Sequence, residues 1–147
     1  MFTTNMNLIY SKCYYSFIKK ANEIEQAIKK ALKSSCGITH TQLNILSILE
    51  QEYPNPVNSN FIKNNLIISS SPDLTRLIDR LVKKELVERY TCPTNRREVN
   101  IVINPKGIET YKKAHKHAKQ VTKNYFSEDL TEEEARTLYK ILSKINI

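Results

Sequence analysis

Short hydroxyl, carboxylate and guanidinium side chains gather between residues 70 and 80, a grouping suited to hydrogen bonding with anions and with the polar edges of bases. A guanidinium group can bind a guanine edge or a phosphate through two parallel hydrogen bonds, and hydroxyl groups can serve either partner. The plainer interpretation is that the serines only cap a helix and the arginines are solvated. The candidates are Ser70, Ser71, Asp73, Thr75, Arg76 and Arg80.

A second polar cluster, Asn95, Arg96 and Arg97, lies between two segments in which apolar and polar residues alternate. Alternation of this kind predicts a β-hairpin, whose tip would hold the arginines away from the body of the protein. A narrow minor groove of DNA attracts an inserted guanidinium group. The alternative interpretation is an ordinary charged turn. The pair of helices that precedes the hairpin favours contact of the arginines with DNA.

The elements that would position these residues are helices on both sides of the hairpin. Apolar residues recur with a helical period over 8–32, and a capping box formed by Thr39 and Gln42 precedes a second helix that ends before Pro54. Asn58 is expected to cap a short third helix.

The next helix is expected to begin at residues 69–72, with serine hydroxyls as caps and Pro72 at its first position. The alternating segments 86–90 and 99–103 form the hairpin, and Pro105 begins a long helix. A second capping box, Thr131 with Glu134, precedes the last helix. The sequence therefore predicts a mainly α protein of the α+β class, with five or six helices and one inserted hairpin.

The overall composition favours a protein with an anionic partner. The chain has 147 residues, 40% of them hydrophobic, and carries a net charge of +8. Nucleic acid is the first expectation for a partner and an anionic membrane surface the second. The N-terminal segment shows no export signal and no membrane span, so a cytoplasmic location is expected.

Enzyme and metal chemistry find little support in the sequence. Only 2 glycines occur, which excludes a glycine-rich phosphate loop, and no cofactor is expected. The 3 cysteines form no closely spaced pair, His115 and His117 point in different directions on a helix, and His40 has no paired ligand. We therefore expect neither an enzyme nor a metal site.

Five motifs together resemble the MarR family of bacterial regulators. The family resemblance rests on residues 41–46 in the second helix, 74–81 in the fourth, Leu86-Val87-Glu88-Arg89 entering the hairpin, 95–97 at its tip and 103–107 leaving it. It implies a winged helix-turn-helix lobe over 39–104 that binds a pseudo-palindromic DNA operator, and dimerisation helices over 8–33 and 106–147. The resemblance also implies a homodimer, with paired recognition helices in successive major grooves and wings in the flanking minor grooves.

Two residues depart from the family pattern. Asn95 stands where the wing usually carries an acidic residue, which leaves Arg97 less firmly oriented and is expected to weaken DNA binding. Glu85 stands where a glycine usually ends the fourth helix, so either Glu85 is strained or the helix ends differently.

Homodimer formation is also expected from the residues themselves. The apolar stripe over 108–125 and the apolar residues Ala135, Leu138, Leu142 and Ile145 exceed what a small core needs. The alternative is that these helices pack only on the first helix of the same chain.

A regulator of this kind would respond to a small molecule or to stress. Tyr14, Phe17 and Tyr111 are the candidate contacts for an effector bound between the lobe and the dimerisation helices. Cys13 lies on the apolar stripe of the first helix, which favours a buried, inert cysteine. Because some peroxide-sensing relatives place a reactive cysteine in this helix, a thiol-based sensor using Cys13 is an alternative.

The favoured function is a DNA-binding transcriptional repressor that acts as a homodimer. A winged helix can also use its exposed face to bind another protein, so a protein-interaction module is the rival from a different class. A nucleic-acid enzyme would need clustered carboxylates, which the sequence does not offer.

Overall fold

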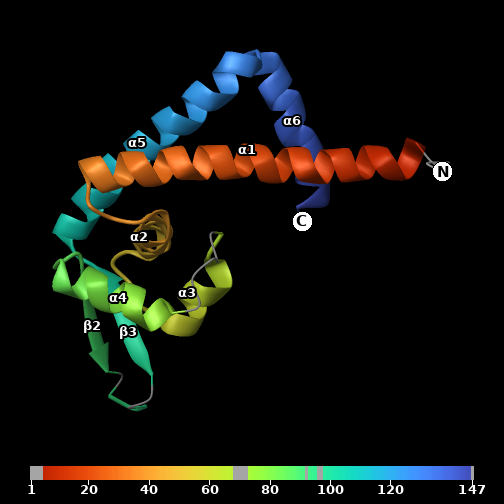
Figure 1. Cartoon of the computed structure of the whole chain (residues 1–147). Coiled ribbons are helices and arrows are strands. Elements are labelled where there is room, and N and C mark those ends of the chain that lie inside the picture. Colours follow the sequence, from red (N-terminus) through yellow and green to blue (C-terminus); the bar gives the residue numbers. More distant parts are fainter. Residues whose placement is uncertain (1–4, 68–72, 92, 96–97, 147) are drawn as a thin grey trace.

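A computed structural model describes residues 5–67, 73–91, 93–95 and 98–146 (Figure 1). Six helices and three short strands occur within these ranges, which agrees with the predicted mainly α architecture. They are α1 (Asn5–Ser35), α2 (His40–Glu52), β1 (Val57–Asn58), α3 (Ser59–Asn65), α4 (Leu74–Lys83), β2 (Val87–Thr91), β3 (Val99–Ile103), α5 (Pro105–Asp129) and α6 (Glu132–Ile145).

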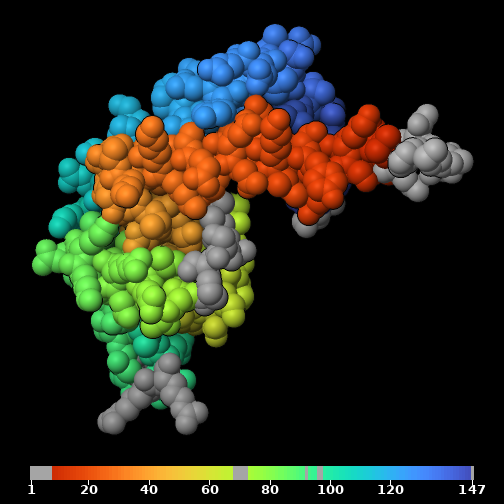
Figure 2. Space-filling view, in the orientation of Figure 1, coloured from red at the N-terminus to blue at the C-terminus, as the bar shows by residue number. Residues whose placement is uncertain are grey.

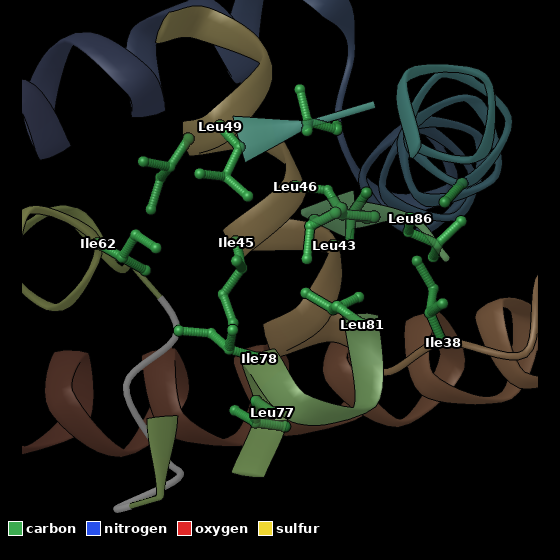
Figure 3. Close-up of a cluster of buried hydrophobic side chains, with 14 of the residues drawn as sticks. Ile38, Leu43, Ile45, Leu46, Leu49, Ile62, Leu77, Ile78, Leu81 and Leu86 are labelled. Atoms are coloured by element: carbon green, nitrogen blue, oxygen red, sulfur yellow. The ribbon is translucent and has the colours of Figure 1, made fainter. Parts of the chain in front are cut away.

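Helix α2 forms the centre of the core. The predicted capping box is present, with the Thr39 hydroxyl accepting from the Gln42 backbone and the Gln42 side chain accepting from the Thr39 backbone, both at 3.0 Å. Figure 3 shows side chains from α3 and α4 converging on this helix. The fully buried residues include Ile45, Leu46, Leu49, Ile62 and Leu81.

The sheet is small and antiparallel, with strand order β1-β3-β2. The hairpin pairs Val87 with Ile103 at its base and Thr91 with Val99 at its outer end. Strand β1 pairs Val57 with Ile101 on the other side of β3 and was not predicted, because its two residues are too few for a visible alternating pattern. This third strand fixes the root of the hairpin to the segment that leads into α3.

Helix α4 ends at a residue in the left-handed region, as one of the two sequence alternatives proposed. Glu85 has φ = 59°, the Glu85 N–H bonds to the Val82 carbonyl at 2.9 Å, and the Leu86 N–H bonds to the Leu81 carbonyl at 3.0 Å. This pair of bonds is the Schellman arrangement, in which a glycine is usual. Glu85 therefore carries the backbone strain that a glycine would avoid.

Helix α5 begins very close to the end of α4. Gly107 makes this approach possible, because a Cβ atom at this position would lie 2.1 Å from the Leu86 carbonyl oxygen. Further along, Ala114 and Ala118 are buried where α5 packs on α1 and α2. The apolar stripe over 108–125, which the sequence interpretation assigned to a dimer interface, therefore packs on the core of the same chain, as the alternative interpretation held.

Helices α1, α5 and α6 extend away from the core. Figure 1 shows α5 and α6 meeting at an angle, with α6 returning across α1. Figure 2 shows the N-terminal part of α1 projecting past the compact lobe. Helix α6 has the predicted capping box of Thr131 and Glu134 but buries none of its residues. Among the described helices, none combines the length and apolar character that crossing a bilayer requires.

Candidate nucleic-acid interface

The predicted DNA-binding residues that the structure describes lie in or beside α4 and the hairpin, at the end of the lobe that faces away from α1 (Figure 1). Helices α3 and α4 and the hairpin of β2 and β3 form this end, and the hairpin points away from the body (Figure 1). Helix α4 buries Leu77, Ile78 and Leu81 against the core. The opposite face is exposed and carries Thr75, Arg76 and Arg80. The local sequence thus produces one apolar face for folding and one polar face for contacts.

The start of α4 differs from the prediction. The helix begins at Leu74 with Asp73 as its N-cap, so the expectation of serine caps with Pro72 at the first helical position is wrong. The Asp73 carboxylate accepts a hydrogen bond from the Arg76 N–H at 3.0 Å, and a carboxylate is as good a cap as a serine hydroxyl. Ser70 and Ser71 lie outside the described residues.

The capping carboxylate also holds the main candidate for base contacts. Asp73 Oδ2 lies 3.5 Å from Arg76 Nε, while the Arg76 side chain remains 70% exposed. The ion pair is weak at this exposure, so it orients the guanidinium group without removing it from solvent. Arg76 is therefore available to an incoming anion.

An ion pair missed by the sequence interpretation joins α4 to the wing. Arg89 Nη1 of β2 donates to Asp79 Oδ1 of α4. Both residues were visible as charges at their positions, but nothing in the sequence indicated that the fold would bring them together. The contact fixes β2 against the helix that carries the candidate base contacts.

A polar cavity lies between the first turns of α3 and α4 and the outer end of the wing. It has a volume of about 460 Å³, and it brings together two predicted site residues, Thr75 and Asn95. Asn58, Asn60 and Glu98 also line it, and none of these three was predicted as a site residue. Arg96 and Arg97 lie outside the described residues.

The three candidate effector contacts are not brought together. Tyr111 lines a cavity of about 350 Å³ between α1, α2 and α5, and its ring stacks on His115 with centroids 5.4 Å apart. Phe17 lines a separate groove of about 600 Å³ between α1, α5 and α6. Tyr14 is exposed and its ring contacts Tyr15 with centroids 5.3 Å apart.

Side-chain contacts of His40 and Lys20 border these cavities. His40 Nδ1 lies 2.5 Å from Glu25 Oε2, which joins the start of α2 to α1. Lys20 lies 3.4 Å from both Glu23 and Asp129 and so joins α1 to the end of α5. The hydrogen bond to Glu23, supported by Asp129, raises the pKa of Lys20 above its ordinary 10.5.

Cys13 is exposed within the single chain, so the expected burial of this residue is wrong for the chain by itself. The helical period predicted an apolar face that includes Cys13, but no other element of the described chain covers this part of α1. Within the described ranges, His, Cys, Asp and Glu side chains nowhere gather in groups of three that could hold a metal ion.

Helices α3 and α4, with an exposed face on α4 beside a β-hairpin, are the arrangement found in winged helix-turn-helix proteins. A model of the MarR family matches residues 38–99. The multiple antibiotic resistance protein MarR of Salmonella typhimurium is 33% identical over 72 residues, which are 49% of this chain and 50% of that protein. The matched part thus spans about half the length of this curated relative.

Solved structures extend the likeness to nearly the whole chain. A MarR variant from E. coli complexed with operator DNA is 20% identical, with a TM-score of 0.77 over 98% of this chain and 100% of that one. BpsR of Bordetella bronchiseptica, whose DNA binding is regulated by 6-hydroxynicotinic acid, is 17% identical, with a TM-score of 0.76 over 92% of this chain and 99% of that one. At these identities the two structures establish the fold.

The resemblance to the MarR family predicted from the sequence is confirmed over residues 38–99 by the family model and over 72 residues by the curated relative, and the solved structures share the fold. The family consists of transcription regulators and not of enzymes. Residues 38–99 accordingly match the winged helix-turn-helix segment of MarR-family regulators.

Proposed function

We propose that this protein is a sequence-specific transcriptional repressor that binds a pseudo-palindromic operator as a homodimer. One observation carries the proposal: the face of α4 that bears Thr75, Arg76 and Arg80 is exposed next to the wing, while α4 is packed firmly on its other face. A helix held in this way can enter a major groove and present its N-terminal residues to base edges. The wing, with Asn95, Arg96 and Arg97, would contact the adjacent minor groove.

The net charge supports this function over a protein-interaction module. A charge of +8 favours phosphate contacts, and binding to DNA through such contacts weakens steeply with salt. Binding that is insensitive to salt and shows no preference for a DNA sequence would favour the interaction module instead.

The experiment that tests this function measures binding to the DNA upstream of the protein's own gene at several salt concentrations, with random DNA as competitor. Arg76→Ala is expected to weaken specific binding by about tenfold to a hundredfold, because a bidentate base contact is worth roughly 1–3 kcal/mol. Arg97→Ala is expected to weaken binding through the wing. Arg136→Ala is the matched control, because Arg136 is an exposed arginine of α6 paired with Glu132 at 2.6 Å. Equal effects of Arg76→Ala and Arg136→Ala would contradict the proposal.

Exposed apolar residues on the terminal helices support the proposed homodimer. Tyr10 is 70% exposed and Tyr139 is 74% exposed, and Ile9, Ile141 and Ile145 are also more than half exposed. Surfaces of this kind on a folded protein mark association sites. A second copy would cover them and would also set the spacing of the two α4 helices, which must match a groove repeat of ~34 Å.

Light scattering after size exclusion tests the dimer. The wild-type chain is expected at twice its mass of 17.1 kDa, and Ile141→Lys is expected to shift the mass toward that of one chain. Ser143→Lys places the same charge two residues further along α6 and is the control. A wild-type mass of 17.1 kDa at micromolar concentration would contradict the homodimer.

The cavity beside Tyr111 supports regulation by a small effector. Its floor is formed by apolar residues that include Ile28, Leu43 and Ala118, and its rim carries His40, His115 and Lys119. An apolar floor with cationic or polar groups at the rim fits a small aromatic acid. A ligand here would touch α1, α2 and α5 at once and would so change the spacing of the lobes.

Isothermal titration with 6-hydroxynicotinic acid as the probe tests this cavity. Lys119→Ala is expected to weaken binding, and Lys112→Ala on the same helix is the control because Lys112 is exposed and does not line the cavity. An equal effect of both variants would place the acid elsewhere on the protein.

A thiol-based sensor is a second candidate mode of regulation, favoured by the exposure of Cys13. A reactive thiol needs solvent access, which Cys13 has in the single chain. Loss of operator affinity under organic peroxide in the wild type but not in Cys13→Ser would support it. Equal affinity of treated and untreated wild-type protein would exclude it.

A further inference from the structure

The side chain of Asn58 makes two contacts that face in different directions. Its Oδ1 accepts a hydrogen bond from the Phe61 N–H at 2.8 Å and so caps α3. Its Nδ2 donates to Glu98 Oε1 at 3.0 Å, across 40 residues of sequence. One amide group therefore joins the first helix of the helix-turn-helix to the outer end of the wing.

The backbone alone holds this part of the wing weakly. The ladder between β2 and β3 reaches its last pair at Thr91 and Val99, and β1 contributes only the pairs of Val57 and Asn58. Glu98 precedes Val99, just beyond the end of both ladders. The Asn58–Glu98 hydrogen bond thus lies two residues beyond the last β1–β3 pair, Asn58 with Asn100, in the direction of the wing tip.

A backbone hydrogen bond joins Glu98 to Asn95, a residue of the segment between the two strands of the wing. The Glu98 N–H donates to the Asn95 carbonyl at 3.0 Å, so Glu98 is bonded to the residue that precedes Arg96 and Arg97 in the sequence. Asn58, Glu98, Asn95 and Thr75 line the same polar cavity of about 460 Å³. The Asn58–Glu98 hydrogen bond therefore forms part of the lining of the cavity that separates the first turn of α4 from the wing.

The charge of Glu98 is unfavourable for DNA binding unless the carboxylate has a positional role. A carboxylate on the surface that meets phosphates repels them, and the lost attraction is largest at low salt. Glu98 is half-buried and uses its carboxylate on an amide donor. An amide at position 98 could accept the same hydrogen bond without the charge.

We propose that Asn58 and Glu98 are positioning residues that set the angle of the wing relative to the helix-turn-helix, and so determine whether the wing reaches the minor grooves that flank the operator. The effect on the minor grooves rests on the proposed DNA-binding function, whereas the effect on the wing angle can be tested without DNA. The Asp79–Arg89 ion pair joins β2 to α4, and the Asn58–Glu98 hydrogen bond joins the residue before β3 to the N-cap of α3. Together the two contacts hold both strands of the wing.

Three variants separate the positional role from helix capping and from charge. Asn58→Ser keeps an N-cap of equal quality, but its side chain is too short to reach Glu98. Glu98→Ala removes the acceptor. Glu98→Gln keeps an acceptor oxygen and removes the charge, so it is the matched control.

The first measurement is the distance distribution between spin labels on α3 and on the wing, attached at Lys63→Cys and Pro93→Cys in the full chain with its native cysteines replaced. Asn58→Ser and Glu98→Ala are expected to broaden the distribution, while Glu98→Gln leaves it unchanged and all three variants keep a melting temperature close to that of the parent. Unchanged distributions in both Asn58→Ser and Glu98→Ala would overturn the inference. A wing that moves while the melting temperature stays constant is not explained by general destabilisation.

The second measurement is hydroxyl-radical footprinting of the unlabelled protein on the operator. Asn58→Ser and Glu98→Ala are expected to lose protection of the flanking minor grooves, to keep protection at the central major grooves, and to bind about tenfold more weakly. Flanking protection equal to that of the wild type would overturn the role in DNA binding. If the wild type itself protects no specific DNA, the proposed function fails, and the spin-label distances still decide whether these residues position the wing.

Discussion

The side-chain amide of Asn104 donates a hydrogen bond of 2.7 Å to the backbone carbonyl of Glu85. The Oδ1 atom of Asn104 accepts from the Gly107 N–H at 2.8 Å, so the same side chain caps α5. The backbone N–H of Asn104 also donates to the Leu86 carbonyl at 3.1 Å. Two of these contacts reach the residues that end α4 and the third caps α5, so Asn104 joins the two helices directly.

The first prediction concerns the left-handed residue at this junction. Glu85→Gly is expected to stabilise the protein by about 0.5–1 kcal/mol, because glycine relieves the backbone strain at φ = 59° and loses part of that gain to the entropy of the unfolded chain. Urea unfolding measures the change. Glu85→Ala keeps the Cβ atom and is expected to give no gain, so an equal gain from alanine would assign the effect to the lost charge.

The second prediction concerns the close approach at Gly107. Gly107→Ala would place a Cβ atom 2.1 Å from the Leu86 carbonyl oxygen and 2.7 Å from Ile103 Cγ1, so α5 must shift. We expect a loss of about 1–3 kcal/mol or more in the free energy of unfolding, although alanine is the better helix former. The exposed site Lys113→Ala on the same helix is the control and is expected to be nearly neutral. A stabilised Gly107→Ala variant would show that the junction is looser than described.

The third prediction separates the two roles of Asp73. Asp73→Ala removes the N-cap of α4 and is expected to cost about 1 kcal/mol of stability. Asp73→Asn keeps the cap, removes a negative charge beside Arg76, and is expected to bind DNA a few-fold more tightly at low salt. Urea unfolding and fluorescence anisotropy measure the two effects. Weaker DNA binding by Asp73→Asn would mean that this carboxylate itself accepts a hydrogen bond from a base.

The fourth prediction concerns the capping box of α6 at low pH. Hydrogen bonds from the backbone and side chain of Thr131 hold the pKa of Glu134 below its ordinary 4.5. A carboxyl group whose pKa is lower in the folded protein stabilises it above pH 4.5, and this contribution is lost as the pH falls through the lowered pKa. Circular dichroism of α6 unfolding should show this pH dependence in the wild type and not in Glu134→Gln. The same acid response in both proteins would contradict it.

Local signals in the sequence predicted most of the helices and the wing. The capping boxes at Thr39 and Thr131 involve partners three residues away, and the hairpin follows from alternation within two short segments. Such features depend on neighbours in the chain and are therefore readable without the fold. The strand β1 was missed because two residues carry no period.

Contacts between distant residues could not be predicted in the same way. Asp79 and Arg89 are 10 residues apart and Asn58 and Glu98 are 40 apart, so only the packed lobe decides that they meet. The cap of α4 was misplaced because serines and an aspartate stand close together and all of them cap helices well. Helical periodicity placed Cys13 on an apolar face, but it does not reveal whether the same chain covers that face.

Helix α6 has 14 residues and buries none of them. A helix of this length is marginal in water without tertiary packing, so its order depends on what covers its apolar side. Where that cover is a second copy of the chain, the fold of α6 obeys mass action, and dilution unfolds this helix before it affects the lobe. The concentration of such a protein in the cell then sets the fraction of chains in which α6 is folded. Reduced synthesis would lower both the number of chains and the fraction of them with a folded α6.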